Sequence, residues 1–102
     1  MLEIRPNCEL CDRDLPPASP DARICTYECT FCADCVDTVL ENVCPNCGGG
    51  FEKRPVRPSN ARRPGLSIEH QPASGTRIHT KYSRDEIVSF AQGAKNTAPE
   101  DR

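Results

Sequence analysis

Eight cysteines carry the most specific chemical signal in this sequence. They all fall between positions 8 and 47 of the 102-residue chain. Their order is Cys8-x2-Cys11, thirteen residues, Cys25-x3-Cys29-x2-Cys32-x2-Cys35, eight residues, and then Cys44-x2-Cys47. Two thiols separated by two residues reach one metal ion from a tight turn, and Zn²⁺ takes four such ligands in a tetrahedron. The spacing therefore predicts two closed four-cysteine sites and two Zn²⁺ ions per chain.

Disulfides and iron–sulfur clusters are the alternatives for so many thiols. The start of the chain, "MLEIRPNCEL", lacks the apolar stretch of a secretory signal, which predicts a cytoplasmic protein and favours metal over disulfides. The spacing from Cys25 to Cys32 matches radical-SAM cluster ligands, but the chain is too short to build the barrel around such a cluster. The bacterial ferredoxin run ends in Cys-Pro, whereas Val36 follows Cys35 here. We therefore favour zinc.

The stretch "VDTVLENV" between Cys35 and Cys44 decides which cysteines share an ion. Its four apolar residues recur at the spacing of an amphipathic helix, which carries the chain about 13 Å. Sulfurs on one zinc lie only roughly 4 Å apart. Because the helix would carry Cys44 much farther than this from Cys35, the two cysteines are expected to bind different ions, which is an interleaved scheme. One ion is then held by Cys8, Cys11, Cys32 and Cys35, and the other by Cys25, Cys29, Cys44 and Cys47. The apolar stripe is expected to pack in the core against Leu10, Ile24 and Phe31.

Residues 8–47 resemble a RING or RING-like cross-brace finger. The resemblance rests on "CELC", on "CTFCADCV" with its phenylalanine, and on "CPNC". Cys29 stands where RING domains usually have histidine. The whole chain is also similar to a small bacterial family of domains of unknown function, number 1272, a likeness that carries no activity with it. The implied fold is a small zinc-stapled α+β domain over residues 1–52, with a short hairpin and one short helix.

The RING resemblance also implies how a ubiquitin ligase would work at this surface. In that family an aliphatic residue in the first knuckle, matched by Leu10, contacts the conjugating enzyme. A hydrophobic residue before the seventh ligand is matched only weakly, by Val39 or Val43. A cation after the last cysteine primes the thioester, but "GGG" follows Cys47 here. This sequence differs from the RING pattern at the residues on which ligase activity depends. The resemblance therefore implies the fold but not the activity.

Charge divides the chain into an acidic head and a basic tail. Residues 1–52 have a net charge of −7 and residues 53–102 a net charge of +5. The stretch "KRPVRPSNARR" holds five cations, two prolines and no acid, which predicts a flexible linker over residues 53–81. Arg57, Arg62 and Arg63 would make it an arm for nucleic acid or an acidic partner. The alternative is a solvated linker that folds back on the acidic head.

The stretch "YSRDEIVSFAQGAK" predicts a short amphipathic helix within residues 82–95. Ser83 and Glu86 are spaced as a capping box, and Ile87 and Phe90 lie on one apolar side. This helix is expected to dock on the head, on a second copy or on a partner, or to remain frayed. Residues 96–102 are expected to be disordered.

The sequence as a whole favours a non-catalytic protein-interaction module with a zinc-stapled head. Histidine, the commonest acid–base catalyst, is absent from the head, and His70 and His79 lie outside the cysteine frame. No apolar run is long enough to span a membrane. The alternatives are ligase-like activity, nucleic-acid binding through the tail, and zinc or redox sensing. The candidate partner-binding residues are Leu10, Val39, Arg57, Arg62, Arg63, Ile87 and Phe90.

Overall fold

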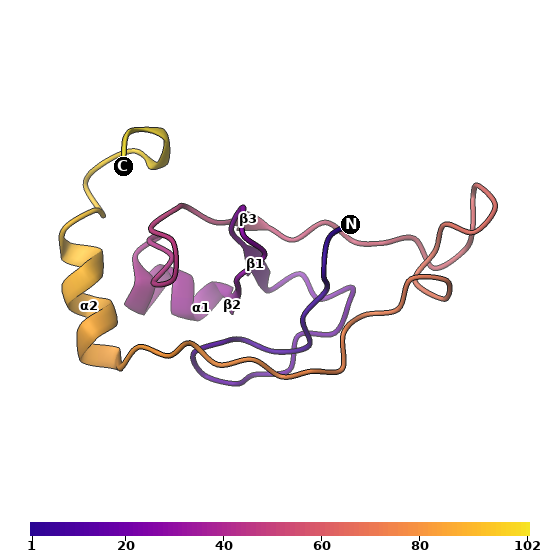
Figure 1. Cartoon of the computed structure of the whole chain (residues 1–102), viewed down its shortest axis with the longest axis horizontal. Helices are drawn as coiled ribbons and strands as arrows, with labels where there is room; N and C mark the ends of the chain where they lie inside the picture. The colour runs from indigo at the N-terminus through magenta and orange to yellow at the C-terminus, as the bar shows by residue number, and fades with distance from the viewer.

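The computed structural model describes residues 1–102 and shows a small α+β fold built on a three-stranded antiparallel sheet. The strands are β1 (Ala22–Ile24), β2 (Thr30–Cys32) and β3 (Glu52–Lys53), in the order β2-β1-β3. In the middle strand, Ile24 lies opposite Thr30 on one side and Glu52 on the other. The turn between β1 and β2 contains two of the cysteines, so the predicted hairpin presents thiols at its end (Figure 1).

A short helix follows the hairpin and ends earlier than the apolar pattern predicts. Helix α1 (Ala33–Cys35) continues into η1 (Val36–Leu40), a wider π-helical turn. The chain then turns out of the helix because Glu41 and Asn42 both have left-handed backbones, with φ of 48° and 60°. Both of their N–H groups donate to the Val36 carbonyl. Val43 lies beyond the helix but is still buried.

Cysteines make up much of the hydrophobic core. The rings of Phe31 and Phe51 meet edge to face with centroids 5.5 Å apart. Leu10, Val39 and Tyr82 are partly buried and pack against the core. Six of the thirteen core residues are cysteines, so thiols replace much of the aliphatic packing of an ordinary core. These thirteen are Cys8, Leu15, Ala22, Cys25, Cys29, Phe31, Cys32, Cys35, Val36, Leu40, Cys44, Phe51 and Ile87.

The prediction of a disordered basic tail is wrong, because the tail lies along the head. Figure 1 shows the segment before α2 running beside the N-terminal segment. The N–H of Ser74 donates to the Ile4 carbonyl at 2.9 Å. The buried side chain of Asn7 donates to the Ile78 carbonyl at 2.9 Å and accepts from the Ile78 N–H at 3.2 Å. The alternative in which this segment folds back on the acidic head therefore describes the chain better.

Arginines of the tail hold it in place through backbone carbonyls. Arg54 is 1 % exposed, and its guanidinium donates to the carbonyls of Arg5, Leu15 and Pro16. Arg57 donates to the carbonyls of Gln71 and Leu2 at 2.6 and 2.8 Å. The composition of the segment predicted a flexible, solvated linker, but each guanidinium group presents five N–H donors that carbonyls of the folded head can accept.

The predicted C-terminal helix is present and docks on the head. Helix α2 (Arg84–Gln92) begins after Ser83, and the capping box with Glu86 is confirmed. The apolar side of α2 buries Ile87 and Ala91. Tyr82, directly before the cap, packs against the same core. No helix of the chain, α2 included, is both long and apolar enough to span a bilayer.

The last residues are also ordered, so the expectation of a disordered end over residues 96–102 is wrong. A short 3₁₀ helix, η2 (Pro99–Asp101), closes the chain. Arg102 donates to the carbonyls of Asn42 and Gly48 at 2.8 and 3.1 Å. This arginine therefore ties the C-terminus to the loop that carries the last two cysteines.

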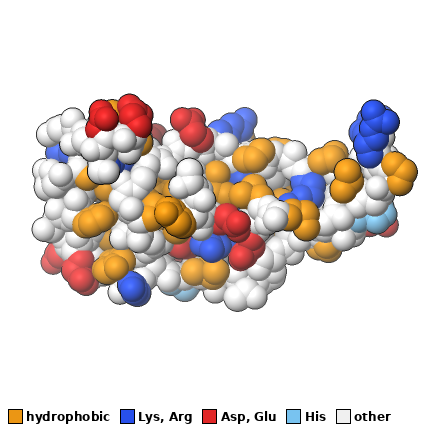
Figure 2. All heavy atoms as spheres, turned by 45° about the horizontal axis from the view of Figure 1, so that its top comes forward, with side chains coloured by type: hydrophobic (Ala, Val, Ile, Leu, Met, Phe, Trp, Pro, Cys, Tyr) orange, Lys and Arg blue, Asp and Glu red, His pale blue; other side chains and the backbone are white.

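One loop projects from the body of the molecule. It closes through the N–H of Ile68, which donates to the Pro58 carbonyl at 2.8 Å, and forms the far end of a molecule measuring 45 × 27 × 19 Å (Figure 1). Cationic side chains gather at the tip of this projection in Figure 2. Arg62 and Arg63 lie in the loop and are exposed.

Candidate metal centres

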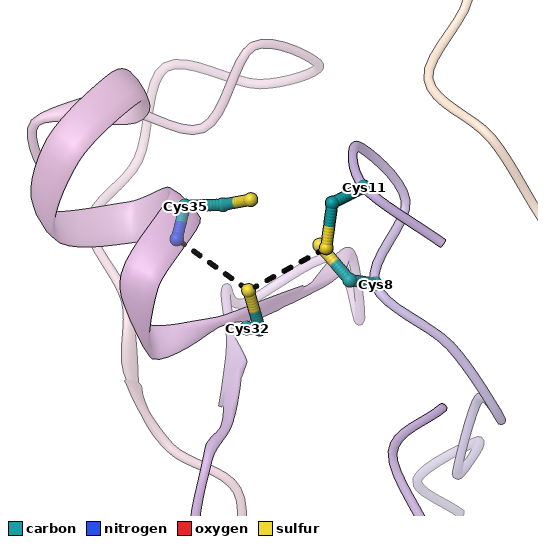
Figure 3. Close-up of side chains that lie close together, drawn as sticks. All are labelled: Cys8, Cys11, Cys32 and Cys35. Carbon is teal, nitrogen blue, oxygen red and sulfur yellow. Dashed lines mark hydrogen bonds between the residues drawn. The ribbon is translucent and has the colours of Figure 1, made fainter. Parts of the chain in front are cut away.

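The first cysteine cluster contains Cys8, Cys11, Cys32 and Cys35. All four sulfurs lie within 4.8 Å of one another, and the sulfurs of Cys11 and Cys32 are 3.8 Å apart (Figure 3). A tetrahedral ion with metal–sulfur bonds near 2.3 Å would separate its ligands by about 3.8 Å. Three of the cysteines are buried and Cys11 is exposed. The geometry of this cluster fits one metal ion.

Two separate parts of the chain bring these four thiols together. Cys8 and Cys11 come from the N-terminal loop, whereas Cys32 ends β2 and Cys35 ends α1. Figure 3 shows the thiols of the two parts facing one another. Cys32 is also the cap of α1, and its sulfur accepts a hydrogen bond from the Cys35 N–H at 3.5 Å.

The second cluster contains Cys25, Cys44 and Cys47, with the sulfurs of Cys25 and Cys47 3.8 Å apart. Cys29, the predicted fourth member, is buried beside them but stands outside the 4.8 Å group. Its backbone is fixed to the same turn, because the Cys25 N–H donates to the Cys29 carbonyl at 3.1 Å. Its thiol points to the Tyr27 carbonyl, 3.9 Å away. The cluster thus shows three close sulfurs with a fourth thiol adjacent.

The two clusters take their cysteines alternately along the chain, which is the interleaved grouping inferred from the spacing. Helix α1 and η1 separate Cys35 from Cys44, so consecutive pairs do not meet at one point. The structure shows which thiols lie together. Their role as metal ligands stays a prediction.

Backbone N–H groups are directed at several of the sulfurs. Tyr27 donates to the Cys25 sulfur at 3.3 Å, and Gly49 donates to the Cys47 sulfur at 3.4 Å. Gly49 is one of the three glycines that follow Cys47. Hydrogen bonds of this kind favour the thiolate over the thiol, which is the form that binds metal.

The pKa values of Cys25 and Cys44 in the second cluster are shifted in opposite directions. A hydrogen bond from the Cys44 thiol is the main cause that lowers the pKa of Cys25 to about 5, and the Tyr27 N–H adds to it. The same bond, followed by burial, raises the pKa of Cys44. Burial is the main cause that raises the pKa of Cys35 in the first cluster. One anionic sulfur is therefore available in the second cluster at neutral pH.

The predicted partner-binding residues divide into buried and exposed sets. Ile87 is 1 % exposed and belongs to the core, so it is not available to a partner in this structure. Leu10 and Val39 are half-buried against the core. Arg57 is half-buried and bonded to backbone carbonyls.

The exposed set consists of Phe90, Arg62 and Arg63. Phe90 is 49 % exposed and stands between two hollows of about 330 and 540 Å³. Both hollows also reach Cys47, so they flank the second cluster. Arg62 and Arg63 form no ion pair.

Arg102 is a residue near the second cluster that the sequence analysis did not find. The cation expected directly after Cys47 is replaced by glycine, but the guanidinium of Arg102 lies 3.1 Å from the Gly48 carbonyl. No sequence signal connects the last residue of the chain with this loop. The contact follows from the path of α2 and η2.

One serine–histidine pair exists, and its geometry is that of a turn. Ser67 Oγ lies 2.7 Å from His70 Nδ1. Ser67 is buried, and its carbonyl accepts from the N–H groups of His70 and Gln71. No carboxylate pairs with His70, so nothing orients it as a general base.

The structure thus defines a small α+β protein with two cysteine clusters that could hold metal. The chain belongs to the family described as "Protein of unknown function (DUF1272)", whose profile matches residues 1–57. The "Uncharacterized protein R02474" of Rhizobium meliloti (strain 1021) is 56 % identical over 78 residues, covering 76 % of this chain and 86 % of that protein. No solved structure matches the chain. The family match contains all eight cysteines, whereas the projecting loop and α2 lie beyond it.

Proposed function

We propose that this chain is a two-zinc, RING-like module that acts by binding a protein partner and not by catalysis. The observation that carries the proposal is the alternate grouping of seven of the eight cysteines into two clusters, with Cys29 buried beside the second. Tetrahedral four-sulfur geometry is typical of zinc or iron–sulfur sites. The short hairpin, the following helix and the alternate grouping together correspond to a cross-brace.

A closed four-thiolate site supports a structural role for the metal. When protein ligands fill all four positions, no place remains for a water molecule or substrate. Most of the thiols are buried in the core, where the metal would replace missing apolar packing. The residues present therefore suit an ion that stabilises the fold.

The side chains around the second cluster support the binding role. Of the five aromatic residues, Phe31 and Phe51 are in the core. The other three lie at the hollows beside Cys47: Tyr82 lines one, Tyr27 lines the other, and Phe90 lines both. Tyr27 is 72 % exposed and Phe90 is about half exposed. Exposed aromatic residues gathered on one face are typical of protein interfaces. We call Tyr27, Tyr82 and Phe90 the aromatic face.

The two parts of this proposal are tested separately. Elemental analysis and native mass spectrometry of protein purified without a metal-binding tag should give two zinc ions per chain. A photo-crosslinking residue in place of Phe90 should capture a defined partner in cells. The matched control carries the same residue in place of Val88, which is 40 % exposed on α2 but lines neither hollow. Equal capture at both positions would contradict the aromatic face as the binding site.

Arg102 supports a second candidate, ligase-like activity. In the resembling family a cation after the last cysteine primes the thioester, and Arg102 brings a cation to the Gly48 carbonyl from the other end of the chain. Against this candidate, the guanidinium already donates to the carbonyls of Asn42, Gly48 and Thr97. Leu10 is also half-buried against the core. We therefore place binding before ligase activity.

The nucleic-acid alternative now depends on the projecting loop. Arg54 and Arg57 are bonded to backbone carbonyls, which leaves Arg62 and Arg63 as the unpaired arginines of the basic stretch. Non-specific nucleic-acid binding weakens with salt according to the number of phosphates neutralised. Two arginines should give a weak, shallow salt dependence. Binding with a salt dependence of this size that is lost in Arg62→Ala/Arg63→Ala would favour nucleic acid.

A further inference from the structure

A buried carboxylate joins the two clusters. Glu9 lies inside the first knuckle, between Cys8 and Cys11, and is 2 % exposed. A buried charge is costly unless it is paired and hydrogen-bonded. Here Oε2 accepts from the Arg5 guanidinium at 2.9 Å and from the Thr30 N–H at 2.5 Å. The other oxygen, Oε1, accepts from the Asn46 side-chain amide at 3.4 Å.

The partners of Glu9 belong to the second cluster as well as to the first. Thr30 directly follows Cys29, which is buried beside the second cluster, and lies two residues before Cys32 of the first cluster. Its carbonyl also accepts from the Glu9 N–H at 3.0 Å, so the two residues are bonded in both directions. Asn46 lies within the last knuckle, between Cys44 and Cys47. A single side chain therefore connects the knuckle of one cluster to the knuckle of the other.

Thr80 holds the same two residues from the C-terminal segment. Its N–H donates to the Glu9 carbonyl at 2.8 Å, and its hydroxyl donates to the Asn46 side-chain oxygen at 3.1 Å. Both ends of the Glu9–Asn46 contact are thus fixed by a third residue. Glu9, Asn46 and Thr80 form a closed set of hydrogen bonds between the two knuckles, which we call the bridge.

We propose that Glu9 is a positioning residue that couples metal binding at the two sites. The proposal rests on the proposed function, because it requires both clusters to bind zinc. Glu9 contributes no ligand itself. When the first site closes, the knuckle that carries Glu9 becomes ordered, and the bridge then fixes Asn46 and with it the knuckle of the second site. The second ion binds to a knuckle that is already ordered, so less entropy is lost, and the coupling acts equally in the reverse direction.

Stepwise removal of zinc tests this coupling in the full-length chain. A chelator is titrated into the two-zinc protein, and native mass spectrometry measures the fractions with zero, one and two ions. Independent, equal sites would give about half one-zinc species at the midpoint of removal. We expect much less of this species in the native chain, because the sites lose their ions together. The coupling factor is the factor by which one bound ion raises the affinity of the other site. In Glu9→Gln and Glu9→Ala this factor should fall about tenfold, and the one-zinc species should accumulate.

The controls separate coupling from general destabilisation. Glu52→Ala removes an exposed carboxylate of β3 that makes no side-chain hydrogen bond, and Leu15→Ala truncates a buried core side chain that is not part of the bridge. Both should leave the one-zinc fraction at the midpoint unchanged, even where total affinity falls. Asn46→Ala should raise this fraction as Glu9→Ala does, and the double variant should add little, since both remove the same contact. Asn46→Ala supplies the same readout if Glu9→Ala fails to fold.

The outcomes distinguish the coupling from the proposed function. A native chain that binds two ions but passes through a half-populated one-zinc species would overturn the coupling and leave the two-zinc module intact. Unchanged one-zinc fractions in Glu9→Gln and Asn46→Ala would overturn the role of Glu9. A native chain that binds fewer than two ions at saturation would contradict the proposed function itself.

Discussion

Asp12 and Gly48 occupy the same position in two knuckles with the same backbone hydrogen bonds. Each follows the second cysteine of its pair and has a left-handed backbone, with φ of 66° and 82°. The Asp12 N–H donates to the Cys8 carbonyl at 3.0 Å, and the Gly48 N–H donates to the Cys44 carbonyl at 2.7 Å. At Asp12 the cost of the left-handed backbone is offset by contacts of its side chain, whose carboxylate accepts from the Asn7 side-chain amide at 3.1 Å. Gly48 has no such compensation.

Gly48→Ala should therefore lower the free energy of unfolding. A left-handed backbone costs a residue with a side chain about 1–2 kcal/mol. The new Cβ would have ordinary room, 3.7 Å from the Phe90 ring, so the cost arises from the backbone. Urea denaturation of the metal-loaded chain measures it. Gly75→Ala is the control, because Gly75 has neither a left-handed backbone nor an atom within 4 Å of a new Cβ; equal effects of both substitutions would refute the explanation.

Removal of metal should unfold the head. Six core residues are cysteines, and structural zinc contributes about 10–16 kcal/mol per site in small zinc-binding peptides. We expect a strong chelator to abolish the dispersed amide NMR signals of residues 8–47, and zinc to restore them. Retention of a native-like spectrum without metal would show that the thiols need no ion to fold.

Cysteine substitutions should report the alternate grouping. With cadmium-113 in place of zinc, each site gives its own NMR resonance. Cys8→Ser and Cys32→Ser should shift or remove one resonance, because their sulfurs lie in the same cluster. Cys25→Ser and Cys44→Ser should affect the other. If Cys32→Ser and Cys44→Ser altered the same resonance, consecutive pairs would share an ion and the cross-brace would be wrong.

Arg54→Met should destabilise the chain by roughly 3 kcal/mol. The substitution preserves much of the apolar volume but removes the donor from the buried Leu15 carbonyl and from the part-buried carbonyls of Arg5 and Pro16. A buried group left unsatisfied costs about 1–3 kcal/mol. Lys53→Met, at an exposed position next in sequence, is the control and should change stability little. Thermal and urea unfolding give both values. A neutral Arg54→Met would show that water replaces the guanidinium.

The chain should not accelerate discharge of a ubiquitin-loaded conjugating enzyme. Glycine follows Cys47, and the guanidinium of Arg102 is already bonded to backbone carbonyls. A thioester-discharge assay should match the rate without added protein. The opposite result is acceleration that disappears in Arg102→Ala but persists in Arg84→Ala, at an exposed position of α2. That pattern would move ligase-like activity ahead of the binding role.

Features that depend on neighbouring residues were accessible from the sequence. The capping box of Ser83 and Glu86 needs only residues three apart, and it is present. The alternate grouping followed from the separation of Cys35 and Cys44 by one helix. That helix ends at Leu40, because the left-handed backbones of Glu41 and Asn42 override the apolar pattern.

Features that depend on distant residues were not accessible. The buried state of Arg54 depends on carbonyls near positions 5, 15 and 16, and Asn7 bonds to a residue 71 positions away. The composition gives the number of charges in the basic stretch, but it does not show that backbone carbonyls of the folded head will accept hydrogen bonds from these arginines. The roles of Glu9 and Arg102 could not be predicted for the same reason. Neither residue belongs to a recognisable motif, and the partners of both come from distant parts of the chain.

The path of the tail along the first knuckle sets an order of events during synthesis. The first cluster has all its thiols once Cys35 has emerged from the ribosome, and the second once Cys47 has. Asn7 then still lacks Ile78, and Glu9 still lacks Thr80, until the second half of the chain is made. A growing chain therefore offers complete thiol sets to metal before the segment that secures them exists. Metal uptake can therefore precede the contacts that Ile78 and Thr80 make with the first knuckle.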